Sequence, residues 1–438
     1  MAHGNYIRII KLAFPIILAN ASVPLLGLTD TAAIGQTGTA ADLGAIALAS
    51  LIFNFVYWGF GFLRMGTTGF VAQAIGAGDI DETHALLFRS VLLGGIIGLL
   101  LVLLQSLIGL AVIGLLTASD EIKTLVGTYF YIRIWGAPAT LITFALLGTF
   151  IGAGWTKQLL AVQLFLNGLN ILLNVLFVVG YDFGVRGIAL GTVLAEWCTL
   201  FFASYLLVGK MQLGNPVLRF RELRSRIFNR TNLTALIKVN GNIMIRTLAL
   251  LTGFAWFANQ GADFGDHVLA ANHVLLQFVS LSAFFLDGYA HVAEMLTGKA
   301  YGARDSESFT QQVRHSSVLA AITALVLAGL VSIFGSQLIP LLTKDVQVQA
   351  IALAHSRYAA IYIAVSFAAF QLDGVFIGVT KSLEMRNATL IALFVFIGVV
   401  LLLAPAYGNV GLWIGFIIYV IARAATLAAY YPRITRAF

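Results

Sequence analysis

The stretch Ala74–Asp79, Ala-Ile-Gly-Ala-Gly-Asp, returns 226 positions later as Ala-Tyr-Gly-Ala-Arg-Asp at Ala300–Asp305. The tripeptide Phe-Ile-Gly at Phe150–Gly152 returns at the same spacing, at Phe376–Gly378. A third pair, closer by two positions, is Gly187–Gly191 with Gly411–Gly415. Three matches in one order, at nearly one spacing, predict that the fold is a duplicated domain.

The composition assigns the chain to a membrane. Of its 438 residues, 60% are hydrophobic and 10% are charged, and the mean hydropathy is +0.93. This is too much apolar surface for a soluble core, so the bilayer must be the solvent. The net charge of +7 is interpreted as basic cytoplasmic loops that contact membrane lipids, and nucleic acid is not expected as a partner. The single cysteine, Cys198, excludes an intramolecular disulfide.

Apolar windows of about 20 residues predict twelve membrane-spanning helices. The windows are 9–33, 43–72, 86–115, 123–150, 158–180, 187–209, 234–260, 267–297, 315–341, 348–379, 387–405 and 410–431. Six fall in each half, and this even number makes the two halves parallel, related by a pseudo-two-fold axis along the membrane normal. We therefore predict an all-α membrane protein with an N-terminal lobe at 1–209, a cytoplasmic basic linker at 210–233 and a C-terminal lobe at 234–438.

Lysine and arginine are unevenly distributed over this topology. Of the 26 basic residues, 18 fall on the side that carries both termini, three on the opposite side and five within spans. Since cytoplasmic loops carry the excess of basic residues, both termini are predicted to be cytoplasmic. The five arginines between positions 219 and 230 are interpreted as an anchor on anionic lipid.

These features resemble the multidrug and toxic compound extrusion (MATE) family. The Gly-Ala-x-Asp turn after the second and eighth spans and the segment Gly184–Thr192 are similar to that family, while Leu372–Thr380 and Ala293–Gly298 are similar to its DinF-like branch. The resemblance covers essentially the whole chain. It implies a bacterial inner-membrane antiporter that exports drug-like, often cationic small molecules in exchange for H⁺ or Na⁺. We accordingly expect a monomer without enzyme activity, and no cofactor other than the coupling ion.

Asp30 is the first candidate site residue. A carboxylate in an apolar span costs several kcal/mol unless it is hydrated, paired or protonated, which points to function. The alternative is an interfacial position, because Asp30 lies 19 residues after Lys11, about 28 Å along a helix and near the full hydrocarbon thickness. The family resemblance places the cation-linked carboxylate at Asp30.

Pro15 and Pro24 make the first span the helix most prone to bend. Each proline removes a backbone hydrogen bond and clashes with the preceding turn. We predict that the helix bends at Pro15 as the charge state of Asp30 changes. A role in fixing the helix shape is the alternative.

Asn167, Asn170 and Asn174 lie on one face of the fifth span, at i, i+3 and i+7. Three amides on one face need a polar cavity or partner helices, and interhelical hydrogen bonding is the structural alternative. The family often has an aspartate where this chain has Asn174. An asparagine can bind a cation through its carbonyl but cannot titrate, so Asp30 becomes the main candidate carrier. Thr192 matches a family position that lines the same lobe, although threonine often bonds its own helix backbone.

The eighth span carries a second polar face, formed by Asp287, His291 and Glu294. A His-x-x-Glu pair can ligate a metal, but no further histidine or cysteine completes a coordination set, so no metal site is expected. These acids are predicted either to pair with polar groups of the C-terminal half or to form a second proton-accessible cluster with Asp373.

Two other functions are less consistent with the sequence. A lipid-linked precursor flippase of the same superfamily would be expected to line its cavity with basic residues, whereas this chain offers acids and amides. An intramembrane enzyme would need a serine, cysteine or paired-aspartate signature in a glycine context, and the sequence has none.

Overall fold

The computed structural model describes residues 2–436 and 438, with their side chains except those of residues 2–4, 25–28, 35–37 and 40. This part of the chain forms helices and turns and contains no strand. The helices are α1 (Ala2–Ala21), α2 (Val23–Thr37), α3 (Ala40–Gly59), α4 (Phe62–Gly76), α5 (Ile80–Leu103), α6 (Gln105–Gly114), α7 (Asp120–Arg133), η1 (Ile134–Gly136), α8 (Ala137–Ala153), α9 (Thr156–Val175), η2 (Leu176–Gly180), α10 (Gly184–Met211), α11 (Pro216–Glu222), α12 (Arg224–Ile227), α13 (Arg230–Ala262), α14 (Asp266–Gly302), α15 (Ser306–Leu342), α16 (Val346–Gly378), α17 (Ser382–Tyr407), α18 (Asn409–Tyr430) and α19 (Pro432–Thr435).

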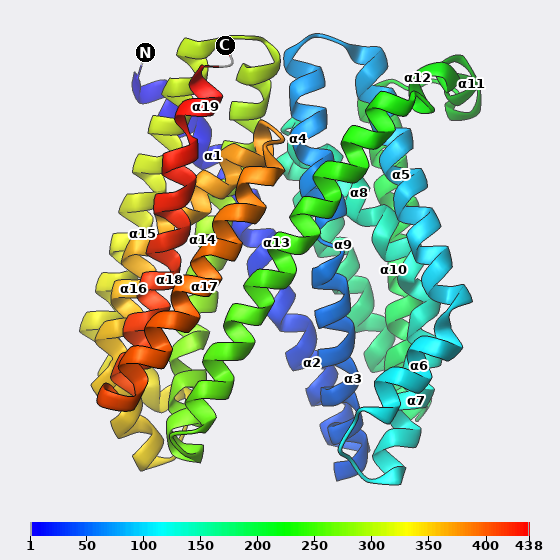
Figure 1. Cartoon of the computed structure of the whole chain (residues 1–438). Coiled ribbons are helices and arrows are strands. Elements are labelled where there is room, and N and C mark those ends of the chain that lie inside the picture. The colour runs from blue at the N-terminus through cyan, green and yellow to red at the C-terminus, as the bar shows by residue number, and fades with distance from the viewer. Residues whose placement is uncertain (1, 437) are drawn as a thin grey trace. The chain divides into compact units, whose positions relative to one another are not determined.

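Eleven helical segments within the described residues are long and apolar enough to span a membrane. They are α3 with α4, α5, α7 with α8, α9 with η2, α10, α13, α14, α15, α16, α17, and α18 with α19 (Figure 1). Each overlaps one of the predicted windows, and the first window, 9–33, coincides with α1 and α2, which are divided at Ser22. The sequence-based prediction of an all-α, twelve-span membrane protein is therefore confirmed.

Several spans are interrupted where the sequence pattern predicts one continuous helix. The first is divided at Ser22, whose hydroxyl donates to the Ala19 carbonyl at 2.7 Å. Pro24 then lies in the first turn of α2, where its missing N–H costs no helical hydrogen bond. The third span is divided at Leu104, between α5 and α6. Apolar periodicity does not register such breaks, because the side chains on both sides remain apolar.

The chain divides into two compact units. The C-terminal unit contains Met1–Ile17, Ala72–Gly78 and Ile237–Phe438, and the N-terminal unit contains Leu18–Val71 and Asp79–Leu236. These units are interleaved in sequence: the linker at 212–229 packs with the N-terminal unit, and α1 as far as Ile17 packs with the C-terminal unit. The lobe boundaries predicted from the repeat, at 209 and 234, follow sequence order and so differ from this division.

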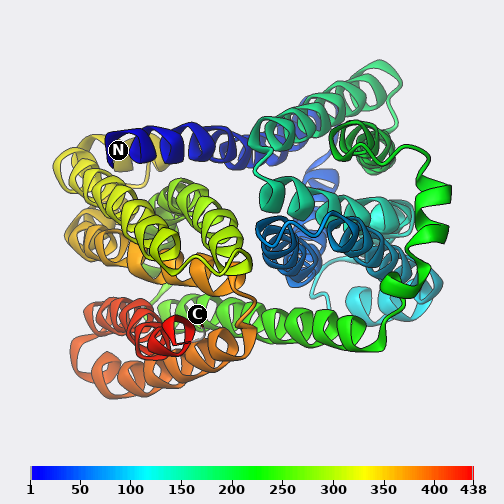
Figure 2. The same cartoon turned by 90° about the horizontal axis from the view of Figure 1, so that it is seen from above.

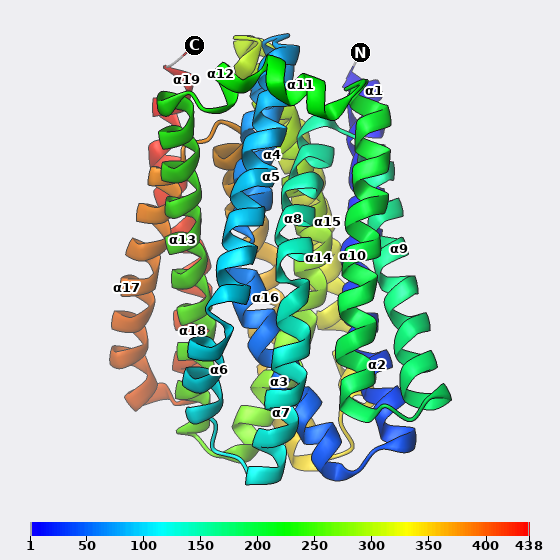
Figure 3. The ribbon, with the colours of Figure 1, turned by 90° about the vertical axis from the view of Figure 1, so that its right-hand side faces the viewer.

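Each unit is a helical bundle with its own packing. In the N-terminal unit, α5 packs on α8, α10 packs on α7, α8 and α9, and α2 packs on α9 (Figure 3). In the C-terminal unit, α16 packs on α14, α15 and α18, and α17 packs along α18 (Figure 2). The core of the C-terminal unit is dominated by aromatic rings, including Trp413, Phe416 and Tyr419 of α18, all fully buried.

The repeat is visible in the backbone as well as in the sequence. Gly78 and its counterpart Arg304 both have a positive φ, of +72° and +55°. Gly154 and its counterpart Thr380 do so too, at +84° and +56°. Glycine adopts this conformation without steric cost. Since Arg304 and Thr380 adopt it at some cost, the turn geometry of the first half has been retained in the second.

Candidate functional site

Asp30 of α2 lies against an amide face of α9. The Asn174 Nδ2 atom donates to the Asp30 carboxylate at 2.7 Å and to the Asn170 Oδ1 atom at 3.0 Å. Asn170 and Asn174 are buried, whereas Asp30 is half-buried. The carboxylate therefore contacts a neutral, fully enclosed hydrogen-bond donor on one side and remains partly accessible on the other.

The same face of α9 also holds the start of α2. The Asn167 Nδ2 atom donates to the Ser22 hydroxyl at 2.6 Å, at the break between α1 and α2. Ser22 and Asp30 are eight residues apart on one segment, and Asn167 and Asn174 are seven apart on the other. The asparagines thus hold α2 at two points, Ser22 and Asp30. They share one face of α9, as predicted, and this face both bonds the two helices together and contacts Asp30.

Thr192 of α10 is half-buried, and its hydroxyl donates to the Ile188 carbonyl at 2.8 Å. Thr192 therefore bonds the backbone of its own helix, which was the alternative role that the sequence allowed. Gly191, also on α10, packs directly against Asn174. A Cβ atom at Gly191 would lie 2.1 Å from the Asn174 Oδ1 atom, which is buried and accepts no hydrogen bond from the described residues. Only glycine allows Asn174 its present position.

Replacing Gly191 by alanine is therefore expected to displace the Asn174 amide from Asp30. Loss of a hydrogen bond to a charged group costs about 1.5–3 kcal/mol, so we expect transport to fall roughly tenfold or more. Gly168→Ala is the matched control, because Gly168 is exposed on α9 and a Cβ atom there meets nothing within 4 Å. The measurement is substrate uptake by proteoliposomes that contain equal amounts of each variant. Equal uptake by Gly191→Ala and the parent would show that the Asn174 position is not needed.

A buried ion pair in the same unit was not predicted from the sequence. Arg133 of α7 binds Glu196 of α10 through two hydrogen bonds of 2.6 Å, and both side chains are buried. The Arg133 guanidinium also lies 5.2 Å from the ring centre of Phe53 and 5.3 Å from that of Tyr57. Arg133 interacts electrostatically with Asp30 as well. One signal was present in the sequence, because an arginine and a glutamate that both lie within membrane spans are expected to form an ion pair.

The second predicted cluster separates into two groups within the C-terminal unit. Asp373 of α16 forms an ion pair with Arg246 of α13 and lies 3.7 Å from the Arg423 Nη2 atom of α18. Asp287 interacts electrostatically with Arg423. His291 and Glu294 form their own contact, 3.0 Å from Nδ1 to Oε1, and both are buried. No group of three or more potential metal-ligating side chains is found among the described residues.

The repeat shows that the polar Asp30 site exists in one half only. Moving 226 positions along the chain from Asp30, Asn170 and Asn174 leads to Trp256, Phe396 and Val400. The packing is retained, since a Cβ atom at Gly415 would lie 2.6 Å from the Val400 Cγ2 atom, as one at Gly191 meets Asn174. The same helix contact is thus polar in the N-terminal unit and apolar in the C-terminal unit.

The chain matches known proteins over most of its length. The MatE family profile matches residues 15–176 and 254–406. DNA damage-inducible protein F of Escherichia coli is 34% identical over 425 residues, covering 96% of this chain and 91% of the relative. Multidrug resistance protein NorM of Vibrio cholerae is 26% identical, covering 96% and 93%. A crystal structure of a MATE transporter of Vibrio cholerae shares the fold, with a TM-score of 0.89 and 20% identity over 100% of this chain and 98% of that one. The chain therefore belongs to the multidrug and toxic compound extrusion (MATE) family, whose members are membrane transporters and not enzymes.

Proposed function

We propose that the chain is an antiporter that exports lipophilic, often cationic compounds in exchange for H⁺ or Na⁺, with Asp30 as the ion-coupling carboxylate. An antiporter needs a group that alternates between a charged form and a neutral or ion-bound form. Burial makes the charged form of a carboxylate costly, so its protonation or its pairing with a cation becomes sensitive to the ion gradient.

One observation carries this assignment: Asp30 is bound by a neutral amide, while the buried carboxylates Glu196 and Asp373 are bound by arginines. Glu196 is held by Arg133, and Asp373 by Arg246. Among the described residues no basic side chain lies within ion-pair distance of Asp30, and its carboxylate accepts a hydrogen bond from Asn174. A carboxylate already neutralised by an arginine gains little from a proton or a sodium ion, whereas Asp30 remains available for either.

The alternative function, a lipid-linked precursor flippase, is less well supported, because the buried arginines that could bind its diphosphate are already paired with carboxylates. Arg133 is neutralised by Glu196, and Arg246 and Arg423 share Asp373. Binding a diphosphate at these positions would leave buried carboxylates without partners, which is strongly unfavourable. The amides and the accessible carboxylate around Asp30 suit a cation.

We also propose that α1 bends at Pro15 during transport. The helix continues through Pro15, a buried residue, and the chain passes from the C-terminal unit to the N-terminal unit between Ile17 and Leu18, two residues later. Because proline already lacks one backbone hydrogen bond, a helix that belongs to both units can bend at Pro15 with the fewest further hydrogen bonds lost. Neutralising Asp30 releases α2 from Asn174 and favours repacking of the first span.

Pro15→Ala is accordingly expected to lower the transport rate severalfold while Asp30 and its contacts remain. Restoring the missing backbone hydrogen bond straightens the helix, so the bent state becomes less populated. Pro24→Ala is the control, because Pro24 lies in the first turn of α2, where proline is compatible with a straight helix. Initial rates of drug efflux from cells with equal expression decide the matter. An equal loss in both variants, or a loss in Pro24→Ala alone, contradicts a bend at Pro15.

The topology and environment complete the proposal. The excess of basic residues on the side of the termini supports a cytoplasmic position for both ends. We further propose that the chain acts as a monomer in the bacterial inner membrane, in contact with its lipids and without nucleic acid, since its relatives from Escherichia coli and Vibrio cholerae are bacterial.

A further inference from the structure

The linker between α10 and α13 is a docked part of the N-terminal unit. The Arg226 Nη1 atom lies 2.9 Å from the Asp79 carboxylate, and Arg219 pairs with Asp81. A backbone N–H from Glu82, followed by Arg226, holds the pKa of the Asp79 carboxyl below its usual value. The carboxylate is therefore charged at neutral pH, and the ion pair that ties the linker to the start of α5 persists.

Apolar contacts reinforce this docking. Leu223 and Ile227 are buried in a small core with Ala85 of α5. The rings of Phe220 and Phe88 meet edge to face, with their centres 5.4 Å apart. Figure 3 shows α11 and α12 lying across the ends of the long helices of this unit. Since one side of the linker is fixed in this way, its other side is presented in a defined geometry.

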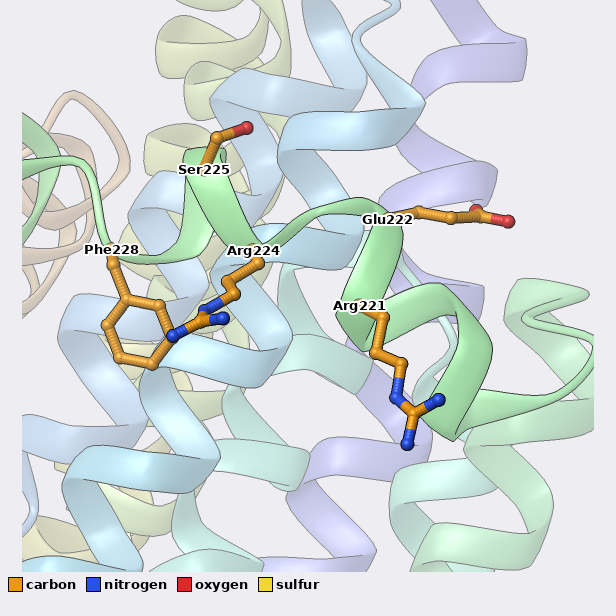
Figure 4. Close-up of a pocket in the computed structure, with 5 residues that line it drawn as sticks. All are labelled: Arg221, Glu222, Arg224, Ser225 and Phe228. Atoms are coloured by element: carbon orange, nitrogen blue, oxygen red, sulfur yellow. The ribbon is translucent and has the colours of Figure 1, made fainter.

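The outer side of the linker carries two arginines that the docking does not use. Arg221 and Arg224 line an open pocket of about 620 Å³ together with Glu222, Ser225 and Phe228 (Figure 4). The Glu222 carboxylate already accepts from the Arg219 Nη1 atom at 3.0 Å. Figure 4 shows the Arg224 guanidinium beside the Phe228 ring and the Arg221 guanidinium extending separately from the neighbouring helix, with Glu222 pointing away from both. Neither guanidinium has an ion-pair partner within the described part of the chain.

The neighbourhood of this pocket is apolar as well as basic. Val217 and Leu218 of α11 are 62% and 55% exposed, and Phe228, directly after α12, is 50% exposed. The linker begins directly after α10, which ends at Met211, and ends where α13 begins at Arg230. It therefore lies where the spans leave the hydrocarbon, a region in which exposed apolar and basic side chains meet lipid tails and headgroups.

We propose that Arg221 and Arg224 form a binding site for the phosphate of an anionic phospholipid, with phosphatidylglycerol as the chemical class. Guanidinium groups bind phosphate oxygens through paired N–H donors, and the two that line this pocket supply more than enough positive charge for the single negative charge of a phosphodiester. The Ser225 hydroxyl is a further donor, and Phe228 contacts the glycerol or the acyl chain. The site is independent of the ion-coupling carboxylate and goes beyond the proposed transport function.

The test is lipid binding by the full-length protein, purified in detergent and titrated with phosphatidylglycerol or phosphatidylcholine while bound lipid is counted by native mass spectrometry. We expect one tight phosphatidylglycerol site in the parent. The double variant Arg221→Gln with Arg224→Gln is expected to bind it about 30-fold more weakly. The matched control is Lys210→Gln with Arg230→Gln, which removes the same charge from exposed positions outside the pocket. This control is expected to bind as the parent does.

Three results would overturn the proposal. The first is unchanged binding by the Arg221 and Arg224 double variant. The second is an equal loss in the control, which would indicate a diffuse attraction of basic residues to anionic lipid. The third concerns the source of the phosphate: glycerol 3-phosphate and inorganic phosphate are tested as competitors, and displacement of the lipid by either at equal concentration would assign the pocket to a soluble anion. Failure of these competitors supports the lipid site.

Discussion

Replacing Asp30 by asparagine is expected to reduce drug efflux from energised cells to the level of cells that lack the transporter. The substitution keeps the shape of the side chain and can still accept from Asn174, but it removes the group that alternates between two charge states. The folded protein should therefore be retained while coupling is lost. Efflux of a fluorescent lipophilic cation, compared at equal protein levels in the membrane, measures this effect.

The control for this substitution is Asp266→Asn. Asp266 is exposed at the start of α14, and its side chain forms no hydrogen bond or ion pair within the described residues. The control should export at the parental rate, which separates the position of Asp30 from a general loss of negative charge. Export by Asp30→Asn at more than about a tenth of the parental rate would show that coupling does not require this carboxylate.

Glu196→Ala is expected to destabilise the protein by about 3–5 kcal/mol, because it leaves the buried Arg133 guanidinium without its partner. Arg133 is enclosed by Phe53 and Tyr57 and donates two hydrogen bonds of 2.6 Å to Glu196. An arginine cannot lose its charge to escape this cost. Thermal unfolding of the purified protein and the yield of inserted protein are the measurements.

The double variant Arg133→Met with Glu196→Leu distinguishes a stability effect from a functional one. Replacing both members of a buried pair by apolar groups is often nearly neutral for stability. We therefore expect the double variant to unfold close to the parental temperature, while Glu196→Ala unfolds well below it. Equal melting of the parent and Glu196→Ala would contradict the buried ion pair.

Apolar periodicity and the internal repeat predicted the spans because bilayer thickness imposes helix length directly. The turn at Asp79 and its copy at Asp305 were predictable for a similar reason. Both carboxylates accept the backbone N–H three residues later, from Glu82 and Ser308, as capping aspartates do. The break at Ser22 was not predictable, since it depends on a tertiary hydrogen bond with Asn167.

The candidate site could be predicted in part. The spacing of the asparagines placed Asn170 and Asn174 on one face of α9, and the cost of a membrane carboxylate singled out Asp30. Their contact joins helices 144 positions apart, which periodicity within one helix cannot reveal. Periodicity within α14 likewise grouped Asp287 with Glu294, because it cannot reveal that their partners come from different elements. Arg423 of α18 interacts with Asp287, and His291 with Glu294.

The central claim, that the Asp30 carboxylate couples export to an ion gradient, is tested most directly in proteoliposomes with the purified protein. A proton gradient and a sodium gradient are imposed separately, and uptake of a lipophilic cation is followed for the parent and Asp30→Asn. We expect one of the two gradients to drive uptake by the parent and neither to drive uptake by Asp30→Asn. Gradient-driven uptake by Asp30→Asn at the parental rate would contradict the claim and move the search for the coupling site to Asp287, Glu294 and Asp373.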